Sequence, residues 1–240
     1  MPEYANTYKN VKLIGTSHIA KGSIDLIAKT FSEYSPDIVC VELDRGRLHA
    51  LLTDEKPDRS LRGIRTYGLQ GYLFALIGGF IQGKLGNVVG VKPGSDMLAA
   101  VNLARREHKQ LELIDQDIAV TLKRFSKSFT WREKFRIVAD IVKAPFSKRM
   151  KIDLNNVPEH ELVSKLILQV KDRYPSIYKV LIEERNYVMA KNIYNIMSKN
   201  PEKNILVIIG AGHEREMLKL IKQEDFRRDK VHLNAALQKF

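Results

Sequence analysis

Two distant stretches of this 240-residue chain share one local pattern. Residues 11–18, VKLIGTSH, and residues 206–213, LVIIGAGH, each place a histidine three residues after a glycine that ends an apolar run. Helical spacing of apolar residues follows both, so each stretch predicts a strand that passes directly into a helix. Glycine permits the sharp turn between them, and small neighbouring residues leave room for a ligand. This arrangement is typical of an α/β protein.

The first fifty residues indicate one βαβ unit. A strand at 11–14 is followed by a helix with apolar residues at Ile24, Ile27, Ala28 and Phe31, which the segment 34–36, Tyr-Ser-Pro, ends. The run Ile-Val-Cys-Val at 38–41 is continuous, as in a strand buried on both faces. Such a unit predicts parallel strands joined by a right-handed crossover.

The rest of the chain extends this pattern. We expect strands at 111–114 and 204–209, a helix at 97–107 after a turn at 93–95, largely helical structure at 61–85, a short strand or loop at 87–91, a helix at 217–222 and a last strand at 231–233. Residues 119–199 show no convincing strand, and we predict three or four helices there, the last over 177–197. The predicted architecture is a single domain, 1–240, with a central, mainly parallel sheet flanked by helices and an all-helical insertion at 119–199.

The insertion is strongly basic. Forty basic and 28 acidic residues give a net charge of +12, and residues 121–153 hold ten of the former but only three of the latter. Among them are Lys127, Arg132, Lys134 and Arg136. Solvated helix faces account for this charge without any partner, and no RNA-binding motif, basic zipper or zinc-finger spacing accompanies it. Nucleic acid or an anionic membrane surface therefore stays open as a partner but is not favoured.

Composition restricts the environment. The single cysteine, Cys40, excludes an internal disulfide, and its place in an apolar strand predicts unreactive packing. The start of the chain lacks the apolar stretch of a signal peptide. The most apolar run, 71–81, falls short of the roughly 20 residues that span a bilayer. We expect a soluble, cytoplasmic protein without a transmembrane segment; the oligomeric state stays open.

Histidine and carboxylate side chains follow three of the predicted strands. His18 and His213 come just after two of them, and Glu42 and Asp44 close the strand at 38–41. Open α/β sheets bind ligands at the carboxyl ends of their strands. Two imidazoles and one carboxylate, from His18, His213 and Glu42, suit Zn²⁺, Mn²⁺ or Co²⁺. An open position on such an ion would hold a water for hydrolysis.

Supporting groups and simpler roles accompany this hypothesis. Asp115 and Asp117 follow the strand at 111–114 and are candidates for indirect support or an additional ligand. Either histidine could instead cap a helix or fill a hydrogen-bonded niche. The acids Glu42 and Asp44 could compensate a helix N-terminus, and Asp44 could pair with Arg47 three residues on. The other histidines, at 49, 108, 160 and 232, read as surface or packing residues.

Six ordered elements of the sequence resemble the TraB/PrgY family, which is related to the Tiki proteases and more distantly to erythromycin-esterase-like and ChaN-like proteins. The resemblance covers most of the chain. The elements are Gly15-Thr16-Ser17-His18, Val41-Glu42-Leu43-Asp44 with Arg47, Pro93-Gly94-Ser95-Asp96-Met97, Ile114-Asp115-Gln116-Asp117-Ile118 with Thr121-Leu122-Lys123-Arg124, Glu184-Arg185-Asn186 and Gly210-Ala211-Gly212-His213. The chain departs from the family pattern where Asp96 replaces Glu, Gln116 replaces Arg and Asn186 replaces Asp.

The resemblance implies an α/β fold with a metal-dependent hydrolase site. Tiki-like members act as metalloproteases, whereas PrgY-like members block a peptide signal. It implies Asp44 or Glu184 as a base or supporting group, Arg47 or Arg185 as an oxyanion stabiliser, and Asp96 as a further supporting carboxylate. We therefore expect a divalent-metal-dependent peptidase first. Binding of a peptide without turnover is the second hypothesis, and binding of nucleic acid or anionic lipid through the basic insertion is the third.

Overall fold

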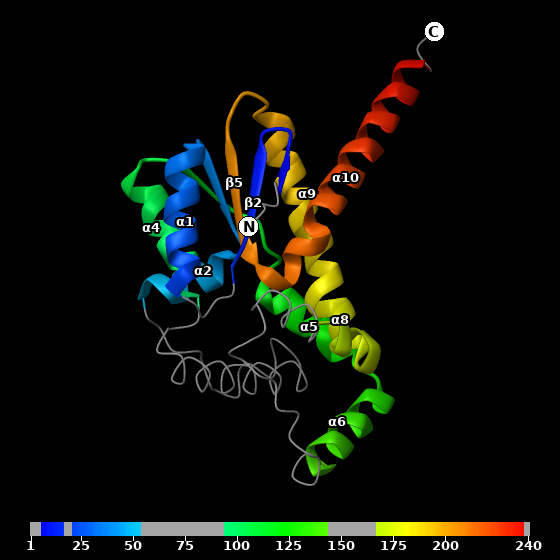
Figure 1. Ribbon diagram of the computed structural model, residues 1–240. Helices are drawn as coiled ribbons and strands as arrows, with labels where there is room; N and C mark the ends of the chain where they lie inside the picture. The colour runs from blue at the N-terminus through cyan, green and yellow to red at the C-terminus, as the bar shows by residue number, and fades with distance from the viewer. Residues whose placement is uncertain (1–5, 17–20, 54–93, 144–166, 238–240) are drawn as a thin grey trace.

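A mostly parallel sheet forms the centre of the protein (Figure 1). The computed structural model describes residues 6–16, 21–53, 94–143 and 167–237. Within them the strand order is β1-β2-β5-β3-β4, with β1 antiparallel to β2 and all other neighbours parallel. The strands are β1 (Thr7–Tyr8), β2 (Val11–Thr16), β3 (Ile38–Val41), β4 (Gln110–Leu113) and β5 (Ile205–Gly210). The predicted central parallel sheet is confirmed.

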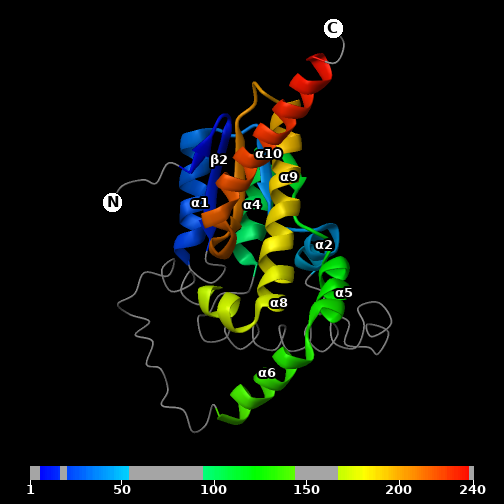
Figure 2. The same cartoon turned by 90° about the vertical axis from the view of Figure 1, so that its right-hand side faces the viewer.

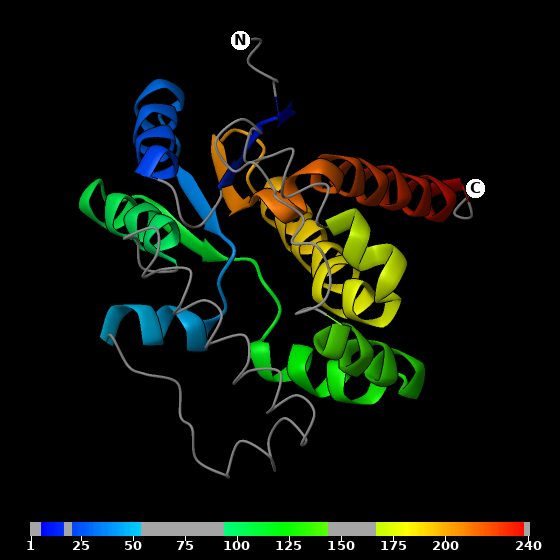
Figure 3. The same ribbon diagram turned by 60° about the horizontal axis from the view of Figure 1, so that its bottom comes forward.

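Helices cover both faces of this sheet, as the view in Figure 3 shows. One face packs against α1 (Lys21–Tyr34) and α4 (Ser95–Arg106), and the other against α9 (Glu184–Lys199) and α10 (Ala211–Leu237). Gly94, with φ of 81°, precedes α4 in the left-handed region that favours glycine. Layers of helix, sheet and helix explain why the inner strands β3 and β5 are apolar without alternation.

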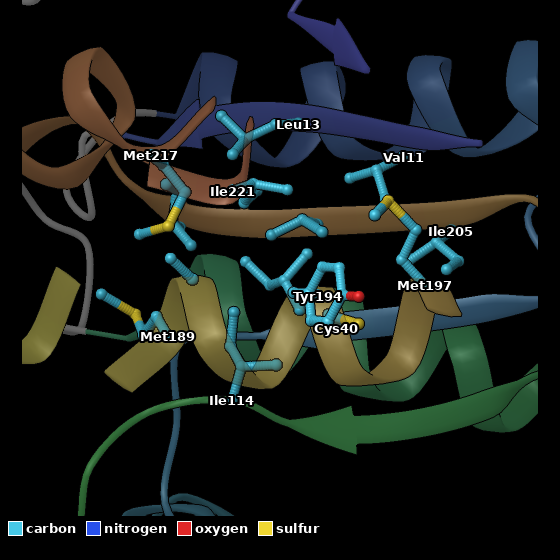
Figure 4. Close-up of a cluster of buried hydrophobic side chains, with 14 of the residues drawn as sticks. Val11, Leu13, Cys40, Ile114, Met189, Tyr194, Met197, Ile205, Met217 and Ile221 are labelled. Carbon is cyan, nitrogen blue, oxygen red and sulfur yellow. The ribbon is translucent and has the colours of Figure 1, made fainter. Parts of the chain in front are cut away.

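The strand β5 lies between β2 and β3 and is buried along its whole length. Ile205, Val207 and Ile209 pack toward α9 and α10. Figure 4 shows Ile205 in this cluster with Cys40 and Tyr194. The alternate residues of β5, Leu206 and Ile208, pack toward α1 and α4. Burial raises the pKa of the Cys40 thiol, in keeping with the expected unreactive packing role.

The helix predicted at 217–222 is only the middle part of α10, which begins at Ala211, directly after β5, and two further details differ from the sequence signals. In α1, Ile27 and Phe31 are buried as the apolar spacing predicts, but Ile24 is 36% exposed. The strand predicted at 231–233 is wrong, because these residues continue α10, which ends at Leu237. The three residues Val-His-Leu are too few to show a period, so the sequence does not distinguish a strand from part of a helix there. The predictions for 61–85 and 87–91 lie outside the described residues.

The described part of the range 119–199 is helical apart from short connections at 129–130 and 174. Its elements are α5 (Ile118–Ser128), α6 (Trp131–Lys143), a helical stretch at 167–173, α8 (Pro175–Tyr178), the π-helical turn η1 (Lys179–Glu183) and α9; α2 (Arg45–Thr53) precedes them in the chain. Met189, Ile193 and Met197 of α9 belong to the core, whereas α6 lies apart from the sheet (Figure 2). The division into one domain with an insertion stays a prediction. Among the described helices, none is long and apolar enough to cross a membrane.

The central position of β5 predicts a large cost for truncating its side chains. We expect Ile208→Ala to lower the free energy of unfolding by about 2–5 kcal/mol, because it leaves a cavity against α1 and α4. Ile24→Ala, the same substitution at an exposed site, should change it by less than about 0.5 kcal/mol. Urea denaturation of both variants measures the difference, and equal stabilities would contradict the packing described for β5.

Candidate active site at the carboxyl ends of the strands

The carboxyl ends of the parallel strands bring distant polar residues to one edge of the sheet. Val41 at the end of β3 pairs in register with Ile208 of β5 and Leu113 of β4. Glu42 therefore follows β3 beside the end of β5. Asp115 follows β4, which lies on the other side of β3. His213 lies in the first turn of α10, directly after β5. All three residues are buried, with 5–8% of their surface exposed to solvent.

Glu42 links the ends of β3 and β5. Its Oε2 accepts a hydrogen bond from the backbone N–H of Gly210 at 2.6 Å. Its other oxygen, Oε1, lies 3.3 Å from Nε2 of His213. One carboxylate oxygen is thus held by the backbone, and the other faces the imidazole.

His213 is oriented from its other side by Asn186 of α9. The Nδ1 atom of His213 lies 2.5 Å from Oδ1 of Asn186. An amide oxygen only accepts hydrogen bonds, so Nδ1 of His213 donates to Asn186 and Nε2 faces Glu42 and Arg185. Asn186 is 1% exposed, and its Nδ2 has no hydrogen-bond partner among the residues that the structure describes. Asn186 is therefore positioned by the packing of α9 and fixes the imidazole tautomer.

The guanidinium of Arg185 lies between two buried carboxylates. Its Nη2 contacts Oε1 of Glu42 and lies 2.5 Å from Oδ2 of Asp115, while its Nε donates to Oδ1 of Asp115 at 3.1 Å. Burial alone would lower the pKa of Arg185, but the charges of Glu42 and Asp115 outweigh it and raise that pKa above its usual value. Nη1 also lies 3.3 Å from Nε2 of His213. Arg185 thus joins all three groups.

A second guanidinium, that of Arg47 on α2, also binds the Asp115 carboxylate. Its Nε donates to Oδ2 of Asp44 at 2.7 Å, and an Nη2 donates to Asp115. The backbone N–H of Arg47 also donates to Oδ1 of Asp44 at 3.0 Å, so Asp44 caps the start of α2. The Asp44–Arg47 pair that the spacing suggested is present, and Asp115 is shared by two arginines.

The remaining predicted site residues bind elsewhere. Asp117 is exposed and caps α5 by accepting from the Ala119 N–H at 2.7 Å. Glu184 forms a two-point ion pair with exposed Arg124, at 2.5 and 2.7 Å. Asp96 is buried on α4 and accepts from the Thr16 hydroxyl at 2.5 Å, beside the end of β2. The site cluster of Glu42, Asp44, Arg47, Asp115, Arg185, Asn186 and His213 therefore leaves these three carboxylates out.

His18 lies outside the described residues, so the proposed trio of metal ligands is described only through Glu42 and His213. Two ligands of a tetrahedral ion with bonds of about 2.0–2.1 Å are about 3.3 Å apart. The 3.3 Å between Glu42 Oε1 and His213 Nε2 matches that spacing. Arg185 contacts both atoms, Oε1 through Nη2 and Nε2 through Nη1, so a cation bound there would have to displace both of these contacts. Within the described ranges, no three His, Cys, Asp or Glu side chains surround one point as a metal would require.

Sequence reasoning gave no role to two residues of this region. Asn186 was noted only as a departure from the family's Asp, because its contact with His213 joins residues 27 positions apart. Thr16 also lacked a predicted role, yet its hydroxyl connects β2 to Asp96 of α4. The element Glu184-Arg185-Asn186 was the available signal for Asn186. Nothing in the local pattern indicated the partner of Thr16.

Fold and site define an α/β protein whose mainly parallel sheet carries a buried cluster of carboxylate, guanidinium and imidazole groups at its strand ends. A family model described as the TraB/PrgY/gumN family matches residues 5–228. The chain belongs to this family, as the motif resemblance implied.

Curated relatives agree with this assignment. An uncharacterized protein of Methanocaldococcus jannaschii is 32% identical over 219 residues, which cover 89% of this chain and 54% of the relative. Human TraB domain-containing protein is 23% identical over 193 residues, covering 75% of this chain and 50% of the relative. The bovine TraB domain-containing protein is 24% identical over an equal length. The chain thus spans about half the length of the curated relatives it matches.

The buried charge cluster predicts a large effect of removing its cation. We expect Arg185→Met to lower the free energy of unfolding by about 3–5 kcal/mol, because Glu42 loses a cation and Asp115 keeps only Arg47. Arg124→Met removes a pair whose arginine is 53% exposed and should cost less than about 1 kcal/mol. Chemical denaturation near neutral pH compares them. Similar losses in both variants would show that the Arg185 contacts contribute no more than surface ones.

Proposed function

We propose that this protein is a divalent-metal-dependent hydrolase that cleaves peptide bonds, with His18, Glu42 and His213 as the ligands. The supporting observation is the 3.3 Å separation of Glu42 Oε1 and His213 Nε2 at the carboxyl ends of neighbouring strands. Thr16, two residues before His18 in the sequence, pairs in register with Gly210 at the end of β5. Membership in the TraB/PrgY/gumN family is consistent with this proposal.

Each residue of the cluster has a definite task in this proposal. A bound divalent cation supplies a Lewis acid that polarises a carbonyl and lowers the pKa of a water. Gly210 holds Glu42 through Oε2, and Asn186 holds the His213 ring with Nε2 directed inward. Arg185 would leave Nε2 and offer its N–H groups to negative charge that develops on the substrate oxygen.

Acidic groups nearby complete the assignment. Asp115 bonds to both arginines and keeps their guanidinium groups at the strand ends. Asp44, buried and bonded to Arg47, is the first candidate for a supporting carboxylate or base, since Arg47 also binds Asp115. Glu184 would have to leave Arg124 to take that part. The pair of Asp44 with Arg47 therefore makes Arg47 the second candidate for oxyanion stabilisation.

A second candidate function, peptide binding without turnover, is favoured by one contact. Arg185 lies against both proposed ligand atoms, and its positive charge can satisfy Glu42 in place of a cation. In that case the charged groups of the cluster bind a peptide, and no bond is cleaved. Saturable peptide binding that Glu42→Gln leaves intact, with no product formed, supports this alternative.

Metal analysis tests the hydrolase directly. The full chain, reconstituted with Zn²⁺, Mn²⁺ or Co²⁺ and dialysed, should retain stoichiometric metal and cleave members of a peptide library. His18→Ala and His213→Ala should lose both properties, because two ligands hold a divalent ion weakly. Elemental analysis and mass spectrometry of the peptides are the measurements.

His49→Ala serves as the matched control, because His49 is exposed and lies outside the cluster. It should behave as the unmodified chain does. Negligible metal in all four proteins, with every metal tried, would falsify the metal-dependent hydrolase.

The contact between Asn186 and His213 generates a separate expectation. Asn186→Leu removes the acceptor that fixes the imidazole tautomer and should weaken metal binding by about 10–100-fold. Asn186→Asp keeps an acceptor of similar shape and should retain most of the affinity. Competition with a chelating dye measures both, and equal affinity of the Leu variant would show that Asn186 does not position His213.

A further inference from the structure

The helix α6 turns its acidic side chains inward and its largest apolar side chains outward. It lies at the end of the molecule toward which the parallel strands point, apart from the sheet (Figures 1 and 2). Glu133 is 3% exposed, whereas Trp131 is 72% and Phe135 is 71% exposed. In a helix of a globular protein the apolar side ordinarily faces the core. This reversal calls for a partner outside the described chain.

Polar contacts fix the inward side of α6. Glu133 accepts from the Ser176 backbone N–H at 2.7 Å, and it forms a capping box with Thr130 at the start of the helix. Asp140, two turns on, binds the Arg173 guanidinium and the Tyr174 hydroxyl. Both acids of α6 therefore have their partners within the protein. They also set the rotation of the helix about its own axis.

The outward side carries aromatic rings and cations. The rings of Trp131 and Phe135, one turn apart, have centroids 6.3 Å from each other. The Lys134 ammonium lies 4.1 Å from the centre of the Trp131 ring, and Arg132 is exposed beside it. Exposed aromatic groups flanked by Lys and Arg characterise helices that lie in a membrane interface.

We propose that α6 is a peripheral anchor that lays Trp131 and Phe135 into the interface of an anionic lipid bilayer. Arg132 is exposed beside the rings and Lys134 lies over the ring of Trp131, so both positive charges lie where an anionic headgroup layer would meet the rings. A helix that projects from the body can meet a flat surface over its whole outer side. Single-stranded RNA also stacks on aromatic rings, but it is bound along grooves, and the exposed pair lies on the outside of one helix.

Trp131 is the single tryptophan of the chain, so its fluorescence reports from α6 alone. We expect phosphatidylcholine vesicles that contain phosphatidylglycerol to shift the emission of the full-length protein to shorter wavelength and to protect it from acrylamide. Pure phosphatidylcholine vesicles should have a much weaker effect, and added salt should reduce the response to anionic vesicles.

Variants separate the aromatic and charged contributions. Phe135→Ser, or the double change Arg132→Gln and Lys134→Gln, should weaken vesicle binding by about tenfold or more in co-sedimentation. Phe226→Ser, at a ring 63% exposed on α10, and the pair Lys191→Gln with Lys199→Gln on α9 are matched controls that should bind as the unmodified chain does.

Three results would overturn the proposal. One is an emission maximum that anionic vesicles leave unchanged. The second is an equal loss of vesicle binding in the control variants, which would indicate charge alone or general apolar exposure. The third is a blue shift that appears with RNA, or with rising protein concentration and no lipid, but not with vesicles. None of these measurements depends on metal binding or hydrolysis.

Discussion

The ion pairs of Arg185 with Glu42 and Asp115 connect α9 to the carboxyl ends of β3 and β4. Two carboxylates buried at adjacent strand ends repel each other and lose hydration, so they require a cation in contact with both. Arg185 comes from α9, which packs on one face of the sheet, while Arg47 reaches Asp115 from α2. The same contacts that stabilise the strand ends thus set the charge and the geometry that a ligand would meet.

Much of the fold follows from the sequence because strands buried on both faces appear as uninterrupted apolar runs. The ends of β2, β3 and β5 were predicted to within two residues for this reason. Because the ends of parallel strands share one edge of the sheet, the sequence also predicted that Glu42 and His213 lie close together. The position of β5 between β2 and β3 could not be read from local periodicity, which carries no strand order. Contacts such as Asn186 with His213 were missed because they depend on how α9 packs, and the strand expected at 231–233 belongs to α10.

The basic residues of the two regions described above lie in different environments. At the strand ends, Arg47 and Arg185 are partly buried, and the carboxylates around them hold their pKa values above the ordinary one. On α6, the acids are neutralised from within and the basic groups stay beside exposed rings. Net charge alone could not separate these cases, because it counts residues and ignores which partner each one meets. The orientation of a few acidic side chains therefore distinguishes the two groups of basic residues, which composition does not.

The placement of β5 has a consequence for biosynthesis. Residues 205–210 are synthesised more than 160 residues after β2 and β3, yet they fill the middle of the sheet. Until they emerge, the facing edges of β2 and β3 have no strand between them, and open edges invite pairing with other chains. The nascent protein must therefore wait for its central strand, and chaperones that shield strand edges would matter most during that interval.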